Sequence, residues 1–226
     1  MEQLTLFGST VARRPIIRKK HSKIEAQRAG QADLWSQEAE RERFMALLFL
    51  DIRNFTPLAE KYEPGRVIHM IQKLFSSFQR IIRVYHGQVI ETTGDGLYAA
   101  FGFGETSTGA AESAVAAGHA IFTVLNAMNG NTTGERIQVG IGIHAGKVAT
   151  GNIRIHSRMH HIVMGHAVNV ASRIQSATKE LNNDFIVSRD VFDLLPHSNV
   201  NTTRCRTRLK GLREEYELYL IGNPYD

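Results

Sequence analysis

Cysteine is almost absent from this chain of 226 residues, since Cys205 is the only one. A single cysteine excludes an internal disulfide and suits a reducing compartment such as the cytoplasm. The sequence also contains no run of about 18 apolar residues, the length that a membrane-spanning helix needs, and its N-terminus lacks the apolar core of a signal peptide. We therefore expect a cytoplasmic protein without a transmembrane segment.

Positive charge is concentrated in one place. The formal net charge is +5, but the run that starts at Arg13 and ends at Lys23 (RRPIIRKKHSK) alone holds six lysine and arginine residues and no acidic residue, which leaves the remainder nearly neutral. A nucleic-acid-binding protein would more often spread lysine and arginine over a folded face, so we expect no nucleic-acid partner. The basic run is interpreted as a solvated tail, or as a segment that contacts membrane headgroups or an acidic partner.

The composition changes near residue 43 and divides the chain into two parts. Residues 1–43 are polar and charged, and residues 24–43 favour a helix with a thin apolar stripe, which we interpret as a linker or docking helix. Residues 44–226 carry regular apolar patterns and are numerous enough to bury the core of one domain.

The apolar pattern of the second part predicts strands and helices in turn. Residues 45–50 (MALLFL) form a short continuous apolar run, typical of a strand buried on both faces. Apolar positions recur at helical spacing after Pro64, and the glycines of the turn GDG (residues 94–96) predict a hairpin. Further elements are expected at residues 88–92 and 97–101 (strands), 107–129 (helix), 137–144 (strand), 167–181 (helix), 185–187 (strand) and 216–221 (strand). The order predicts an α+β fold of the ferredoxin-like kind, with helices on one face of a sheet.

Two aspartates are candidate metal ligands in this arrangement. Asp51 ends the first strand, and Asp95 lies at the tip of a hairpin that can lie beside it. Two carboxylates held together bind hard cations, and Mg²⁺ combines one or two carboxylates with phosphate oxygens. The structural alternative is that Asp51 caps the next turn and that GDG is an ordinary hairpin turn.

A second pair of polar residues lies on the third predicted helix. Asn169 and Arg173 are four residues apart and therefore project from the same face. An amide beside a guanidinium suits a ribose and a phosphorane, because arginine offers a rigid fork of donors to phosphate oxygens. The alternative is an ordinary surface hydrogen bond or a salt bridge within the helix.

Four motifs contain these residues, and together they resemble one family. They are FLDIRNFT (residues 49–56), ETTGDGLYAAFG (91–102), GIHAGKVATGN (142–152) and VMGHAVNVASR (163–173). Their order and spacing are similar to those of class III adenylate and guanylate cyclase catalytic domains, over about residues 45–222. The resemblance implies an antiparallel or mixed sheet with helices packed on it, and it makes residues 44–226 the catalytic domain.

The resemblance also implies a role for each matching residue. Asp51 and Asp95 match the aspartates that bind two Mg²⁺ (or Mn²⁺) ions, with the backbone of Ile52 beside them. Asn169 matches the asparagine that orients the ribose, and Arg173 matches the arginine that stabilises the transition state. The triphosphate is expected to meet Asn54, Phe55, Thr56 and Lys210.

In this family the two half-sites come from different subunits. The metal aspartates belong to one protomer and the asparagine–arginine pair to the other, so the resemblance implies a homodimer with shared active sites. The implied reaction closes a nucleoside triphosphate into a 3′,5′-cyclic monophosphate, a second messenger, and releases pyrophosphate. The structural alternative is a degenerate domain that binds a nucleotide or a partner without turnover.

The residues that match the base-specificity positions depart from the common patterns. Glu91 stands where adenylate cyclases carry lysine and guanylate cyclases carry glutamate, which argues against ATP. Ile162 stands at the second position and cannot hydrogen-bond a base. The chain therefore resembles the bacterial pyrimidine cyclases of antiphage defence, which implies UTP or CTP as substrate and a signal in antiviral defence. The alternative is a guanylate cyclase in which Glu91 alone recognises guanine.

Overall fold

The computed structural model describes residues 41–130, 136–155, 158–196 and 202–225. The predicted basic tail and most of the predicted docking helix lie outside the described residues. Residues 41–43, the last three of the predicted helix, belong instead to strand β1, which starts at Arg41. The division of the chain at residue 43 stays a prediction.

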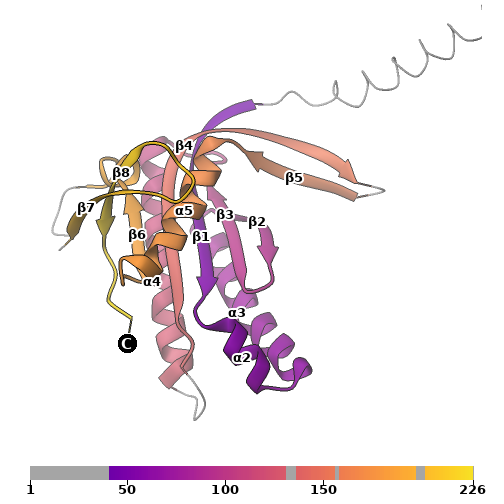
Figure 1. The fold of residues 1–226 in the computed structure, drawn as a ribbon. Helices are drawn as coiled ribbons and strands as arrows, with labels where there is room; N and C mark the ends of the chain where they lie inside the picture. The colour runs from indigo at the N-terminus through magenta and orange to yellow at the C-terminus, as the bar shows by residue number, and fades with distance from the viewer. Residues whose placement is uncertain (1–40, 131–135, 156–157, 197–201, 226) are drawn as a thin grey trace, which may run out of the picture. The chain divides into compact units, whose positions relative to one another are not determined.

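The described residues form a mixed sheet with helices, as predicted (Figure 1). The strands follow the order β2-β3-β1-β4-β6-β8-β7, and β5 pairs with β4 outside this path. All the pairs are antiparallel except β4 with β6. The strands are β1 (Arg41–Ile52), β2 (Gln88–Thr93), β3 (Gly96–Phe101), β4 (Val139–Ile155), β5 (Arg158–Met164), β6 (Phe185–Ser188), β7 (Thr203–Arg208) and β8 (Glu215–Leu220). The helices are α2 (Phe55–Lys61), α3 (Pro64–Val84), α4 (Ser107–Gly130), α5 (His166–Glu180) and α6 (Arg189–Phe192).

β1 lies between β3 and β4 and is covered on both faces. Leu48 and Leu50 belong to the core cluster that includes residues of α3 and α4. Met45 and Leu47 belong to a second cluster that includes residues of α5. Because side chains alternate along a strand, the continuous apolar run serves two cores, which confirms the prediction of a doubly buried strand.

The prediction that the helices lie on one face was wrong. α3 and α4 cover one face, whereas α5 covers the opposite face. Gly142 of β4 permits this second layer, because a Cβ atom there would clash with the backbone of Gln175 on α5. The glycine lets the helix backbone pack directly on the strand.

The strand after α4 is longer than its apolar pattern predicts. β4 continues to Ile155 and turns back as β5, which the sequence did not predict. Figure 1 shows this pair, hereafter the β4–β5 arm, extending away from the rest of the sheet. α2 and β7 were not predicted either.

Candidate active site

The sheet brings the two predicted metal ligands together. Asp51 is the last but one residue of β1, and it pairs in register with Gly96, the residue after Asp95. The backbone N–H of Ile52 donates to the carbonyl oxygen of Asp95 at 3.0 Å. The tip of the β2–β3 hairpin therefore lies beside the end of β1, as the sequence predicted.

The position of Asp51 disfavours its charged form. Burial is the main cause that raises the pKa of Asp51 to about 6, and the negative charge of Asp95 adds to it, while Arg53 acts in the opposite direction. A cation close to Asp51 would favour its charged form, because opposite charges attract. Carboxylate oxygens are ligands that suit Mg²⁺ or Mn²⁺.

The protein itself supplies few ligands for such an ion. Within the described ranges, no three His, Cys, Asp or Glu side chains gather closely enough to hold a metal. Mg²⁺ commonly completes its coordination with water and with the phosphate oxygens of a substrate.

The predicted triphosphate loop follows directly after Asp51. Asn54 has a left-handed backbone, with φ of 52°, and precedes α2. Asn54 and Thr56 are exposed, and Phe55 is partly buried against the core. A cavity of about 410 Å³ lies beside the loop, and Asn54, Arg53, Lys61 and Arg136 are among the residues that line it.

The predicted ribose and transition-state residues lie on the exposed side of α5. α5 buries Val170, Ala171 and Ile174, whereas Asn169 and Arg173 are exposed on its opposite side. Helical geometry therefore directs both side chains away from their own sheet. This is the orientation that an active site shared between two chains requires.

The two base-specificity positions lie on different elements. Glu91 is exposed on β2, opposite Tyr98, which in turn is paired with Phe49 of β1. The rings of Phe49 and Tyr98 stack at 4.5 Å between centroids. Burial, and then the charge of Glu91, raise the pKa of Tyr98. Ile162 is partly buried on β5, opposite Gly151.

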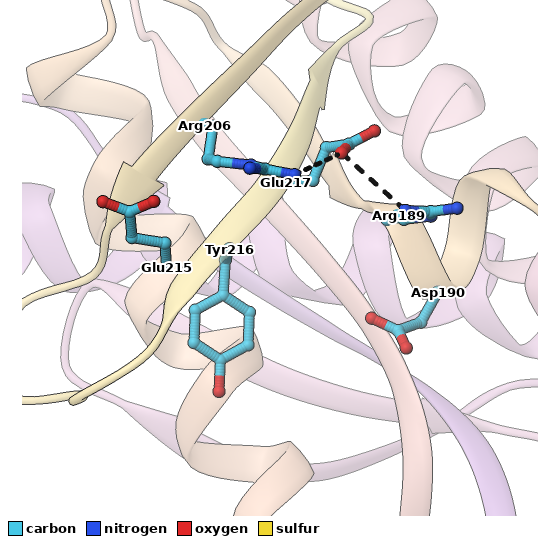
Figure 2. Close-up of a pocket in the computed structure, with 6 residues that line it drawn as sticks. All are labelled: Arg189, Asp190, Arg206, Glu215, Tyr216 and Glu217. Carbon is cyan, nitrogen blue, oxygen red and sulfur yellow. Dashed lines mark ion pairs between the residues drawn. The ribbon is translucent and has the colours of Figure 1, made fainter.

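Lys210 is exposed in the turn between β7 and β8. Residues of β7, β8 and α6 line a polar cavity of about 310 Å³, and Figure 2 shows six of them. Inside it, Glu217 forms ion pairs with Arg189 at 3.8 Å and Arg206 at 3.5 Å (Figure 2). None of the predicted site residues lines this cavity, so we interpret it as a structural ion-pair cluster.

Sequence reasoning missed Arg53 as a residue of the site. It lies inside the motif FLDIRNFT, and its charge lowers the pKa of Asp51. Its hydrogen-bond partners, Thr178 and Tyr225, are distant in sequence and belong to no shared pattern. The motif could have identified Arg53, but no local signal could have identified its partners.

A mixed sheet that holds two carboxylates at the end of a central strand and an amide–guanidinium pair on a covering helix is the arrangement of a nucleotidyl cyclase domain. Residues 37–223 match the family model of the adenylate and guanylate cyclase catalytic domain. The chain belongs to this family, which confirms the resemblance drawn from the four motifs.

Individual relatives agree with this assignment. An adenylate cyclase of Anabaena cylindrica is 34% identical over 185 residues, which cover 79% of this chain and 37% of that protein. Adenylate cyclase 1 of Rhizobium meliloti is 26% identical over 196 residues, or 84% of this chain and 29% of that protein. The solved guanylyl cyclase Cya2 has a TM-score of 0.74 at 25% identity, covering 84% of this chain and 96% of that one. The chain spans about a third of the length of these two curated relatives.

Of the helices that the structure describes, none has the length and apolar composition required to cross a bilayer.

Proposed function

We propose that this chain is a nucleotidyl cyclase that converts a nucleoside triphosphate into a 3′,5′-cyclic monophosphate and pyrophosphate. The observation that carries the proposal is the placement of Asp95 beside Asp51, whose pKa is raised by burial and then by the charge of Asp95, so that a cation would stabilise its charged form. Asn169 and Arg173, exposed on α5, supply the complementary half of the site.

In the proposed reaction the ribose 3′-oxygen attacks the α-phosphorus in line with the leaving group. The bond from the α-phosphorus to the bridging oxygen breaks, pyrophosphate leaves, and the 3′-hydroxyl proton passes to solvent. Two Mg²⁺ or Mn²⁺ ions, held by Asp51, Asp95 and the Ile52 carbonyl, would lower the pKa of the 3′-hydroxyl and neutralise the triphosphate.

The other residues bind and orient the substrate. Asn169 holds the ribose, and the guanidinium of Arg173 stabilises the negative charge that develops on the pentacoordinate phosphorus. Lys210 and the backbone from Asn54 to Thr56 bind the terminal phosphates. Positioning and charge stabilisation account for most of the catalysis, as in other phosphoryl transfers.

The active unit in this proposal is a homodimer with two shared sites. Asn169 and Arg173 face away from their own sheet, so they reach metal carboxylates only in a second copy of the chain. The β4–β5 arm adds apolar surface for this contact on both of its faces: Ile153 (43% exposed) and Met164 (62%) lie on one face, and Met159 (51%) lies on the other. Apolar side chains on a projecting hairpin are typical of a surface that a partner covers.

We assign the substrate as a pyrimidine nucleotide, UTP or CTP, and the product as a signal in antiviral defence. Glu91 is exposed and ready to accept a hydrogen bond from uracil N3–H or the cytosine amino group. Ile162 fills the far end of the base pocket in the dimer and would leave the guanine O6 without a donor. Guanine is the alternative, because Glu91 also suits its N1 and N2 hydrogens.

The location proposed for the enzyme is the cytoplasm, where NTPs and Mg²⁺ are available. The basic run from Arg13 to Lys23 would give only peripheral contact with an acidic surface.

The test is to incubate the purified protein with ATP, GTP, CTP and UTP separately, each with Mg²⁺ or Mn²⁺, and to identify products by mass spectrometry. The proposal predicts a cyclic pyrimidine nucleotide and pyrophosphate in equal amounts. Cyclic GMP as the main product would retain the cyclase and overturn the base assignment. No cyclic product from any of the four would favour a binding domain without turnover.

A further inference from the structure

Arg53 lies two residues after Asp51 and is held by two segments that are distant in sequence. Its Nε atom donates to the hydroxyl of Tyr225 at 2.9 Å, and its guanidinium lies 5.0 Å from the centre of the Tyr225 ring. Its Nη2 atom donates to the hydroxyl of Thr178, a fully buried residue of α5. The backbone N–H of Arg53 donates to the carbonyl of Gln138 at 2.8 Å. Both ends of the residue are therefore fixed.

The space for this guanidinium is created by a glycine. Gly140 of β4 is the direct strand partner of Asp51. A Cβ atom at residue 140 would clash with the Arg53 guanidinium and with the hydroxyls of Thr178 and Tyr225. The Arg53 guanidinium and the two hydroxyls therefore meet over the backbone of Gly140, which pairs with Asp51.

The segment that carries Tyr225 is itself tied to the loop between α5 and β6. The backbone N–H of Asp184 donates to the carbonyl of Asn223 at 2.8 Å, and the N–H of Asn223 donates back to the Asp184 carboxylate at 2.7 Å. The N–H of Tyr225 donates to the Asn182 side chain at 3.2 Å. Tyr225 lies beyond residue 223, where the match to the cyclase family ends.

These contacts form a strap, residues 222–225, that runs from the end of β8 to the metal loop. Tyr225, at the end of the strap, accepts a hydrogen bond from Arg53, which is the charged residue nearest in sequence to Asp51. Two hydroxyl oxygens hold the Arg53 guanidinium in one place, so its positive charge acts on the Asp51 carboxylate from a fixed direction. The same two hydrogen bonds limit the motion of the loop that carries Arg53.

We propose that Arg53 is a positioning residue for the metal-binding loop of Asp51 and Ile52, and that Tyr225 and Thr178 hold it in place. The inference rests on the proposed function, because it concerns the affinity of the same metal site. Groups that hold metal ligands in position typically change metal affinity or activity on the order of tenfold or more when they are removed.

The test compares Tyr225→Phe with wild type in the full chain. The substitution keeps the aromatic ring and every charge, and it removes only the hydroxyl that accepts from Arg53. Mn²⁺ binding is measured by the paramagnetic resonance signal of the free ion in the presence of pyrophosphate, and the half-saturating Mn²⁺ concentration and kcat are measured with the NTP that the enzyme uses.

The matched control is Tyr219→Phe, which removes a hydroxyl that donates to Glu217 at 2.9 Å, within the ion-pair cluster of Figure 2. We expect Tyr225→Phe to raise both the Mn²⁺ dissociation constant and the half-saturating concentration about tenfold. We expect kcat at saturating Mn²⁺ to change less than about twofold, and Tyr219→Phe to behave as wild type. Thr178→Val, which removes the second acceptor, is expected to act in the same direction as Tyr225→Phe.

Unchanged Mn²⁺ binding in both Tyr225→Phe and Thr178→Val would overturn the inference, as would a loss of kcat at saturating metal with unchanged Mn²⁺ affinity. A wild-type protein that makes no cyclic nucleotide would instead contradict the proposed function. The binding measurement distinguishes the two cases, because it needs no turnover.

Discussion

Asp51 is a carboxylate placed where its ionisation is unfavourable in the metal-free protein. Burial and Asp95 raise its pKa from 3.8 to about 6. A folded state that holds a proton more tightly than the unfolded state loses stability as the pH rises through the window between the two pKa values. The loss of folding stability caused by the Asp51 carboxylate is therefore complete above about pH 6. A bound cation would reverse this loss, because it favours the charged form of the carboxylate.

Replacement of this carboxylate should stabilise the metal-free chain. We expect Asp51→Asn to raise the free energy of unfolding at pH 7.5 by about 1–2 kcal/mol, a figure discounted because the group is only about half buried. The gain should shrink as the pH falls from 6 and vanish below about pH 4, where Asp51 is protonated in both states. Urea denaturation with EDTA across this range measures it, with the exposed Glu60→Gln as control. A gain that is independent of pH would contradict the pKa assigned to Asp51.

Single residues differ in how far the sequence could predict them. The pairing of Asp51 with Asp95 was predictable, because a strand and a glycine-rich hairpin with apolar flanks have few ways to meet. The contact of Arg53 with Tyr225 was not, because it joins residues 172 positions apart without any periodic signal. Long-range polar contacts of this kind depend on the packing of the whole domain.

At the scale of elements, the contact between β4 and α5 determines where Asp51 lies relative to Asn169 and Arg173 of the same chain. β4 pairs with Asp51 of β1 on one side, while α5, packed on the same strand, carries Asn169 and Arg173. Gly142 sets the distance between the two layers, since the backbone of Gln175 occupies the place of a side chain.

A side chain at residue 142 should weaken the packing of α5 on β4. We expect Gly142→Ala to lower the free energy of unfolding by about 1–3 kcal/mol, because the methyl group forces α5 away from β4. The control is Gly65→Ala, where α3 leaves open space around the added methyl group and where alanine is the better helix former. Urea denaturation of both variants tests the prediction. Equal stability of Gly142→Ala and wild type would mean that α5 does not pack as the structure describes.

The elements that the sequence missed share a physical cause. β5 (RMHHIVM) mixes basic, histidine and apolar residues without strict alternation, because it pairs with β4 on a projecting arm and, of its residues, only Val163 is buried in a core cluster. β1 was predicted correctly because both its faces are buried. A strand that is buried on both faces requires helices on both faces of the sheet. The prediction that all helices lie on one face did not take this into account.

At the scale of the whole molecule, the proposed active site is divided between two parts of the described chain, Asp51 with Asp95 at the end of β1 and Asn169 with Arg173 on the exposed side of α5. The proposed homodimer would account both for the apolar arm and for the exposure of Asn169 and Arg173. Sequence periodicity reports what a chain buries in its own core, so only the family resemblance could predict a partner.

The arm should contribute to the dimer. We expect Met159→Glu to raise the dissociation constant of the homodimer at least about tenfold, because a carboxylate would be desolvated at an apolar contact. Sedimentation over a range of protein concentrations measures this constant. The control is Ile68→Glu, at a side chain that is 59% exposed on α3. An unchanged dissociation constant for Met159→Glu would exclude this part of the arm from the interface.

The central claim is that carboxylates from one chain and the amide–guanidinium pair of another complete one active site. Asp51→Ala and Arg173→Ala should each be inactive alone, because every dimer of either variant lacks the same group at both sites. An equimolar mixture should regain about a quarter of the wild-type rate, since half of the dimers are mixed and each of these has one intact site. Measurement of cyclic nucleotide formation by the two variants, alone and mixed after subunit exchange, gives the result directly. A mixture as inactive as its components would contradict the shared site.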